Sequence, residues 1–279
     1  MQSDHNIQKK IALINDYTGF GKCSLAVQLP IISYLGVACA PLPTAILSNH
    51  TAYDDYYIDD YTKHWTEYID KWRSLKLRFE GIYSGFLGSV DQIAMVEDFA
   101  KEFLKPGGLV VVDPIMADDG RVYDTYTREM CDEMKRLVCI ADVVTPNITE
   151  ACILIGCDYK EKWTFKELFD IACEISGMGA SRTVITGIAT EHTLGNFVYE
   201  KGKEPVIVRC KRREVSRCGT GDVFSSIIAA DCLNGVDFLQ SVKRASTFVS
   251  QALLKTEMLG MDPRDGIAFE DILDKLKRC

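Results

Sequence analysis

The segment Cys218–Asp222, with the sequence Cys-Gly-Thr-Gly-Asp, combines a phosphate-binding turn with a carboxylate that could act as a base. Glycines on either side of Thr220 permit a tight turn whose successive backbone N–H groups point at one spot. The apolar run that follows is expected to form a helix, whose positive N-terminal end would point at the same spot. The turn and the helix end together would form a binding site for a phosphate. Asp222, in the first helical turn, could take a proton from a hydroxyl that attacks the phosphate. The same residues also fit an ordinary turn with Asp222 as a helix cap.

A second glycine-rich segment, residues 19–24, looks like a nucleotide-binding P-loop but departs from it at two positions. That motif needs Gly, four residues, and then Gly-Lys-Ser or Gly-Lys-Thr. Here Asp16 stands at the first glycine position and Cys23 at the hydroxyl position. Residues 19–24 are therefore interpreted as a flexible loop after the first strand that could close over a substrate. The chain also lacks a Gly-x-Gly-x-x-Gly motif after a strand, which argues against a nicotinamide dehydrogenase.

Short apolar runs alternate with longer amphipathic runs, which indicates alternating strands and helices. The expected strands are 11–15, 38–47, 81–85, 109–114, 141–147, 183–186, 193–199 and 205–210. The expected helices are 24–35, 59–78, 90–104, 125–139, 164–177, 221–234 and 238–255. The continuous apolar run at 109–114 is typical of a parallel strand that is buried on both faces. The predicted fold class is therefore α/β, a three-layer α/β/α sandwich with a central, mostly parallel sheet, in a single domain over residues 1–279.

Asp, Asn and Thr residues gather where the expected strands end. These strand-end positions are 15–16, 48–51, 113, 145–147 and 186–187. In open α/β sheets, ligands bind beyond the carboxyl ends of the strands. The clustering therefore indicates a ligand site at that edge of the sheet.

The composition of the 279 residues is globular, with 47% hydrophobic and 26% charged residues. A net charge of −8 argues against a general nucleic-acid binder, which needs a basic face. The eleven cysteines are scattered without a Cys-x-x-Cys pair, as expected of small buried side chains in a reducing cytosol. No apolar run approaches the length of a membrane-spanning helix or a signal-peptide core. We therefore expect a cytoplasmic protein whose partners include neither nucleic acid nor a membrane.

Four motifs, taken together, resemble the ribokinase-like superfamily and, within it, the pyridoxal (vitamin B6) kinases. The motifs are SNHTAY (48–53), VVVDPIMADDG (110–120), TPNITEA (145–151) and GTGDVF (219–224). They occur in the family's order, and their span covers most of the chain. Four matches at family-like separations are more specific than any one of them, so the resemblance favours a base over a helix cap at Asp222.

The resemblance implies a role for each matched position. Asp222 would be the base, and the N–H groups of Gly219, Thr220 and Gly221 would stabilise the transferring phosphoryl group. The residues implied to contact ATP are Asp113, Asp118, Asn147, Thr186 and Gly187. The residues implied to hold Mg²⁺, partly through water, are Asp113, Asn147 and Glu150. The residues implied to contact the substrate ring are Asp16, His50, Thr51 and Phe86, although Phe86 would equally fit plain core packing. A monovalent cation such as K⁺ and a homodimer are further expectations of the family.

Two positions depart from the family pattern. Many pyridoxal kinases have Ser where this chain has Asp16, whose carboxylate could pair with a protonated pyridine nitrogen or bind a ring hydroxyl or amino group. Ala117 replaces a common Gly in one of two candidate flaps, residues 117–124. The other candidate flap is residues 205–216, where Lys211, Arg212 and Arg213 could attract ATP or simply form a solvated charge run.

The activity implied by the resemblance is ATP- and Mg²⁺-dependent phosphorylation of the 5′-hydroxymethyl group of pyridoxal, pyridoxamine or pyridoxine. Two alternatives stay open. The first is a hydroxymethylpyrimidine kinase of thiamin synthesis, because Asp16 also resembles the polar residues that such kinases place on a pyrimidine ring. The second is a non-catalytic B6-binding protein that retains the fold, against which the intact motif at 219–222 argues.

Overall fold

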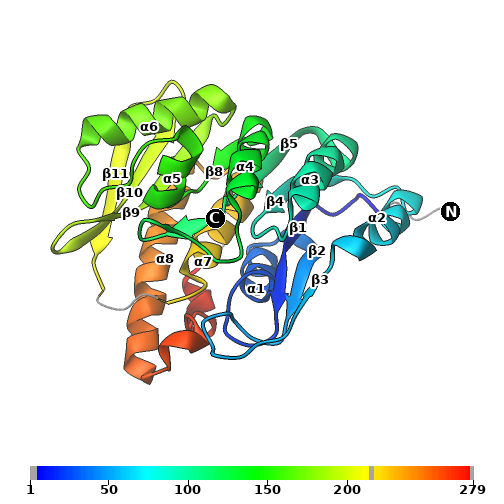
Figure 1. Cartoon of the computed structure of the whole chain (residues 1–279), viewed down its shortest axis with the longest axis horizontal. Coiled ribbons are helices and arrows are strands. Elements are labelled where there is room, and N and C mark those ends of the chain that lie inside the picture. Colours follow the sequence, from blue (N-terminus) through cyan, green and yellow to red (C-terminus); the bar gives the residue numbers. More distant parts are fainter. Residues whose placement is uncertain (1–4, 214–216, 277–279) are drawn as a thin grey trace.

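A single nine-stranded sheet forms the centre of the computed structural model, which describes residues 5–213 and 217–276 (Figure 1). Its strand order is β11-β10-β9-β8-β5-β4-β1-β2-β3. The strands are β1 (Lys10–Thr18), β2 (Ala38–Leu47), β3 (Ile58–Asp60), β4 (Phe79–Ser84), β5 (Leu104–Val112), β8 (Val143–Val144), β9 (Arg182–Ala189), β10 (Thr193–Glu200) and β11 (Val206–Lys211). Neighbours from β2 to β9 are parallel, and β3, β10 and β11 add antiparallel edges. The prediction of a mostly parallel sheet is confirmed.

Helices cover both faces of the sheet (Figure 1). One layer holds α2 (Trp65–Ser74), α3 (Val90–Phe103), α4 (Arg128–Ile140), α5 (Ile148–Ile155) and α6 (Phe165–Met178). The other holds α1 (Leu25–Tyr34), α7 (Thr220–Leu233) and α8 (Phe238–Leu259). Along β1, Ile11 and Leu13 face the second layer, whereas Ala12 and Ile14 face the first. This alternation follows from the two-residue period of a strand, and it confirms the three-layer α/β/α sandwich. None of the described helices is long and apolar enough to cross a lipid bilayer.

The helix expected over 59–78 is wrong at its N-terminal end. Residues Ile58–Asp60 form the edge strand β3, which pairs antiparallel with Ala45–Leu47, and Thr62–His64 form a short 3-10 turn. The α-helix begins only at Trp65, whose indole N–H donates to the carbonyl of Pro43. Pairing with β2 therefore outweighs the helical pattern of residues 59–60. This is a tertiary effect that cannot be predicted from local sequence.

The strand expected over 141–147 is also shorter than predicted. β8 covers only Val143–Val144, and the chain then enters α5, which the sequence analysis did not predict. Pro146 has no N–H for the sheet, and Asn147 starts α5 by accepting a hydrogen bond from the N–H of Glu150. The pattern Asn-x-x-Glu was therefore also a helix-start signal.

Helix α7, which begins at the Gly-Thr-Gly-Asp motif, is buried along most of its length and packs against α1 and α8. Asp231 on α7 accepts a hydrogen bond from Arg244 on α8 at 2.7 Å, and its carboxylate is almost completely buried. Arg244→Ala would leave this carboxylate buried without its cation, so we expect the free energy of unfolding to fall by about 3 kcal/mol. Urea unfolding of this variant and of Lys243→Ala, an exposed cation one residue away, tests it. Equal stability of the two variants would contradict this account of the α7–α8 contact.

Candidate active site

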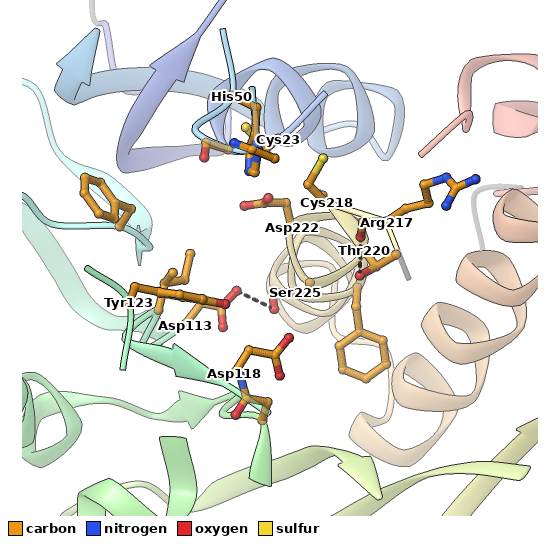
Figure 2. Close-up of a pocket in the computed structure, with 18 of the residues that line it drawn as sticks. Cys23, His50, Asp113, Asp118, Tyr123, Arg217, Cys218, Thr220, Asp222 and Ser225 are labelled. Atoms are coloured by element: carbon orange, nitrogen blue, oxygen red, sulfur yellow. Dashed lines mark hydrogen bonds between the residues drawn. The ribbon is translucent and has the colours of Figure 1, made fainter. Parts of the chain in front are cut away.

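A cavity of about 820 Å³ opens at the carboxyl ends of the parallel strands. All of the residues predicted for the site line it: Asp16, His50, Thr51, Phe86, Asp113, Asp118, Asn147, Glu150, Thr186, Gly187, Gly219, Thr220, Gly221 and Asp222. They come from segments far apart in the sequence, and Figure 2 shows several of them pointing into one space. The structure therefore brings the predicted residues together, whereas their individual roles remain predictions.

The sheet order divides this cavity into two ends. Segments that follow β2 and β4 line one end with His50, Tyr56 and Phe86. Strands β10 and β11 and helix α8 lie toward the opposite edge of the sheet and line the other end with Leu194 and Val249. Between the two lie the N-terminus of α7 and the acidic residues. This shape suits two bound molecules that meet in the middle.

Asp222 lies in the first turn of α7, as predicted, and is only 7% exposed. Gly219 precedes the helix in the left-handed conformation, with φ of 82°. The side chain of Asn15 donates to Oδ1 of Asp222 at 3.4 Å. Burial raises the pKa of the Asp222 carboxyl to about 7, and the nearby carboxylates of Asp113 and Asp16 also raise it. A hydrogen bond from the N–H of Ser24 lowers the pKa and partly offsets these effects. A carboxyl with a pKa near 7 is well matched to accepting a proton at neutral pH.

This raised pKa predicts how activity depends on pH. If the ionised form of Asp222 is the base, kcat/KM should rise about tenfold per pH unit below about pH 7 and level off above it. A pH profile of kcat/KM measures this directly. In His50→Gln the same limb should persist, because burial lowers the pKa of His50 below its usual value. A profile without this acidic limb would contradict the assignment of Asp222 as the base.

Asp113 sits at the end of β5 beneath the cavity and is held by hydroxyl groups. Its carboxylate accepts hydrogen bonds from Ser225 at 3.0 Å, Thr145 at 3.2 Å and Tyr83 at 3.3 Å, and Figure 2 shows it facing α7. Burial raises the pKa of Asp113 to about 6, and the three hydroxyl donors oppose that shift. The position of this carboxylate is therefore fixed before any ligand binds.

Asn147 and Glu150 form the capping box that begins α5. The N–H of Glu150 donates to Oδ1 of Asn147 at 2.9 Å, and the N–H of Asn147 donates to Oε2 of Glu150 at 2.8 Å. Oε1 of Glu150 also accepts from the N–H of Met116 at 3.1 Å. Each oxygen keeps further lone-pair capacity, so the two side chains have a structural role that does not prevent ligand contact.

Three carboxyl groups, those of Asp113, Asp118 and Glu150, line this side of the cavity. Burial raises the pKa values of Asp113, Asp118 and Glu150, and the charges of Asp113 and Asp118 raise that of Glu150 further, well above its usual value. A cation would relieve this repulsion. Among the described residues, no group of three or more His, Cys, Asp or Glu side chains could hold a metal ion by itself. A metal here would therefore need other oxygen ligands, and Mg²⁺ usually takes them from water and substrate phosphates.

At the opposite side of Asp222, Asp16 forms a compact polar group with two hydroxyls. Its Oδ1 accepts from Ser24 at 2.5 Å and its Oδ2 accepts from Thr18 at 2.7 Å. Burial raises the pKa of Asp16, whereas both hydrogen bonds and nearby His50 lower it. Nδ1 of His50 accepts the N–H of Ala52 at 3.1 Å, which leaves Nε2 as the free ring nitrogen.

Phe86 and Thr51 complete this end of the cavity. The ring of Phe86 packs edge-on against Tyr126, with centroids 5.9 Å apart, and its backbone N–H donates to Oδ1 of Asn15 at 2.8 Å. Phe86 is therefore both a cavity wall and part of the core packing, which the sequence analysis had treated as alternatives. Thr51 is exposed in the loop after β2.

Comparison with known proteins places this site in a family. The sequence profile of the family described as phosphomethylpyrimidine kinase matches residues 32–264. The chain belongs to the phosphomethylpyrimidine kinase family. Relatives and solved structures named as B6 kinases also match this chain, which confirms the ribokinase-like fold and the resemblance to B6 kinases.

Relatives of this kinase carry two kinds of name. A Bacteroides thetaiotaomicron protein, provisionally described as a phosphomethylpyrimidine kinase, was solved in two crystal forms. The first form superposes on this chain with a TM-score of 0.95 at 37% identity, and the match covers 98% of this chain and 95% of that one. The other form contains pyridoxal and superposes with a TM-score of 0.93 at 36% identity, covering 98% and 97%. A Bordetella avium pyridoxine/pyridoxal/pyridoxamine kinase is 26% identical over 86% of this chain and 82% of its own. An Aquifex aeolicus hydroxymethylpyrimidine/phosphomethylpyrimidine kinase is 28% identical over 65% and 69%.

The candidate flap of this family member at 117–124 is a small hairpin of β6 (Ala117–Asp118) and β7 (Arg121–Val122). Its turn has positive φ at Asp119 and Gly120, not at Ala117, so the replacement of Gly by Ala at 117 causes no backbone strain. In Figure 2, Tyr123 after the hairpin points toward the acidic residues. The hairpin therefore provides one wall of the site.

The other candidate flap is mostly strand β11, and residues 214–216 lie outside the described residues. Arg212 donates to the carbonyl of Thr190 at 3.1 Å, and Arg213 pairs with Glu257 at 3.6 Å. These two cations thus have partners within the protein, while Lys211 ends the strand.

Four polar residues of the kinase site were not assigned from the sequence. Asn15 and Ser24 contact the Asp222 carboxyl, and Thr145 and Ser225 hold Asp113. Asn15 had a visible signal, since it ends a buried strand next to Asp16. Ser225 also had one, because it lies three residues after Asp222 and shares its helix face.

Proposed function

We propose that this kinase transfers the γ-phosphoryl group of ATP to the 5′-hydroxymethyl oxygen of a B6 vitamer. The observation that carries the proposal is the Asp222 carboxylate, buried at the N-terminus of α7 in the middle of a two-ended cavity. One end would hold the vitamer ring and the other the nucleotide, so that the two reacting groups meet beside Asp222. The presence of pyridoxal in the crystal of a 36% identical relative supports this choice of acceptor.

In this proposal Asp222 takes the proton of the acceptor hydroxyl as its oxygen attacks the γ-phosphorus in line. The transition state of such transfers is loose, so positioning and charge stabilisation provide most of the acceleration. The N–H groups of Gly219, Thr220 and Gly221 would supply that stabilisation, together with the positive end of α7. These backbone groups lie at the N-terminus of α7, so the helix itself would orient them toward the phosphoryl group.

At the nucleotide side, the proposal assigns the acidic residues to metal and phosphate binding. Asp113, Asn147 and Glu150 would hold Mg²⁺, partly through water, and Asp118, Thr186 and Gly187 would contact the ATP phosphates. The raised pKa values of Asp113, Asp118 and Glu150 fit a site that binds a cation. The ion would neutralise charge on the phosphates and orient them.

At the acceptor side, Asp16, His50, Thr51 and Phe86 would contact the ring. The ionised Asp16 carboxylate is an acceptor only, so it suits a ring that presents a proton, such as a pyridinium N–H. A carboxylate–pyridinium hydrogen bond is charge-assisted and strong in a buried place.

Phosphorylation of hydroxymethylpyrimidine is the second candidate function. The family description and the Aquifex aeolicus relative favour it. The amino group of an aminopyrimidine could also donate to Asp16. The choice between the two functions therefore depends on which ring binds at the end of the cavity lined by Phe86.

Steady-state kinetics with MgATP and each separate acceptor test the proposal. We expect kcat/KM for at least one of pyridoxal, pyridoxamine and pyridoxine to exceed that for hydroxymethylpyrimidine by tenfold or more, about 1.4 kcal/mol of transition-state discrimination. The reverse order would move this enzyme to pyrimidine phosphorylation with the same mechanism. Tight ring binding without any ADP formation would instead indicate a non-catalytic B6-binding protein.

A further inference from the structure

Ser24, the residue before α1, has a backbone conformation that residues with side chains avoid. Its φ is 52° and its ψ is −134°, and its side chain is only 5% exposed. Glycine tolerates such angles, whereas other residues keep them only where the surroundings enforce them. Strain of this kind gathers at functional sites, which directs attention to what Ser24 contacts.

The Ser24 hydroxyl does not cap helix α1, although Ser24 is the N-cap residue. A serine at a helix N-cap usually accepts a hydrogen bond from an N–H of the first turn, but Ser24 makes no such side-chain cap. Its Oγ donates instead to Oδ1 of Asp16 at 2.5 Å, while Thr18 donates to the other oxygen. The hydroxyl is thus committed to the carboxylate at the acceptor end of the cavity.

The backbone N–H of Ser24 contacts a second carboxylate, that of Asp222. The N–H group forms a hydrogen bond that favours the ionised form of Asp222 and so lowers the pKa of that carboxyl against the effect of burial. Ser24 is therefore linked to both Asp16 on β1 and Asp222 on α7. Asn15 provides a second link, because its side chain accepts from the N–H of Asp16 and donates to Asp222. The unusual φ and ψ of Ser24 are what allow its side chain and its N–H to serve different groups.

The loop that carries Ser24 is locked against the start of α7. A Cβ atom on Gly219 would overlap the carbonyl oxygen of Lys22, so the two backbones are in direct contact. The thiol of Cys218 donates to the carbonyl of Gly21 at 3.4 Å. This packing supplies the constraint that holds Ser24 in its strained conformation.

We propose that Ser24 is a positioning residue that fixes the Asp16 and Asp222 carboxylates relative to each other. The inference rests on the proposed function, in which Asp16 contacts the acceptor ring and Asp222 its hydroxymethyl group. Ser24 would then set the placement of the reacting oxygen by tying the ring contact to the base. It acts through the two carboxylates and not by touching the transferring group.

Ser24→Gly tests the inference, because glycine relieves the strain and keeps the N–H but removes the hydroxyl. We expect a Tm at or above that of the wild type, together with a KM for pyridoxal about tenfold higher and a smaller change in kcat. Ser33→Ala, which removes an exposed hydroxyl from α1, is the matched control and should change neither value. A merely structural role for Ser24 would not raise KM in a variant of equal or greater stability.

A double-mutant cycle shows whether Ser24 acts through Asp16. Once Asp16→Asn has been introduced, the further change Ser24→Gly should alter KM less than twofold, because the carboxylate that it positions is gone. Additive effects of the two changes would overturn the inference. So would an unchanged KM in Ser24→Gly alone.

The inference can fail separately from the proposed function. Carbon-13 NMR titration of the Asp16 carboxyl in the ligand-free protein requires no turnover. In Ser24→Gly its pKa should rise, since a donor that favours the ionised form is lost. An unshifted Asp16 titration overturns the role of Ser24 even in an active kinase. A wild type that phosphorylates no acceptor, with the Asp16 shift present, rejects the proposed function and keeps the Ser24–Asp16 link.

Discussion

Asp222→Asn is expected to lower kcat with pyridoxal by about 10²–10⁴-fold, the range that general base catalysis usually contributes. The amide has nearly the shape of the carboxylate and can still accept hydrogen bonds from Asn15 and Ser24, so the fold should persist. It cannot accept the proton of an attacking hydroxyl. Because burial disfavours the charged carboxylate, Tm should stay equal or rise slightly.

Single-turnover kinetics measures this loss without interference from product release. The matched control is Asp91→Asn, which changes another carboxylate in the first turn of a helix, α3, outside the cavity. That variant should keep the wild-type kcat. If folded Asp222→Asn retained near-full activity, Asp222 would not be the base, and α7 would have to act through its backbone alone.

Gly219→Ala is expected to have the second largest effect. Gly219 has φ of 82°, and an added Cβ would overlap the carbonyl oxygen of Lys22, which is backbone and cannot move aside cheaply. The start of α7 would therefore shift, and with it the N–H groups proposed to stabilise the transferring phosphoryl group. Misplacing one such donor typically costs 10²–10³-fold in kcat, so we expect a fall of about that size.

Gly221→Ala distinguishes two causes of lower activity, a shifted start of α7 and a disturbed contact with the phosphate. Apart from the adjacent residues and the backbone of α7 itself, no protein atom lies within 4 Å of a Cβ at this position, and Ala favours a helix, so Tm should not fall. Any rise in KM for ATP in this variant would report contact between residue 221 and a phosphate. Gly219→Ala should lower both Tm and kcat. Wild-type kcat in Gly219→Ala would show that the precise course of this turn does not matter for catalysis.

Much of the frame of the site follows from local sequence. Strands β1 and β5 each contain a continuous apolar run, and a parallel sheet requires their carboxyl ends to lie at one edge. Asp16 and Asp113 follow those runs, so their convergence could be predicted without any contact information. The start of α7 was equally readable, because two glycines before an apolar helical run specify both the turn and the helix.

The parts that could not be predicted depend on contacts between distant segments. Asn15 and Asp222 are 207 residues apart, and only the folded chain shows their hydrogen bond. The strain at Ser24 arises from packing of its loop against α7, which leaves no local signal. Helix α5 was missed for another reason: Asn147 and Glu150 were read only as ligands, although the same spacing also specifies a capping box.

The central claim, phosphoryl transfer to a B6 vitamer with Asp222 as base, is tested most directly by the product itself. Wild-type protein and Asp222→Asn would be incubated with MgATP and pyridoxal, and pyridoxal 5′-phosphate and ADP quantified by mass spectrometry. We predict equal amounts of the two products from the wild type, and a rate 10²–10⁴-fold lower from the folded variant. ADP without pyridoxal 5′-phosphate, or equal rates in both proteins, would contradict it.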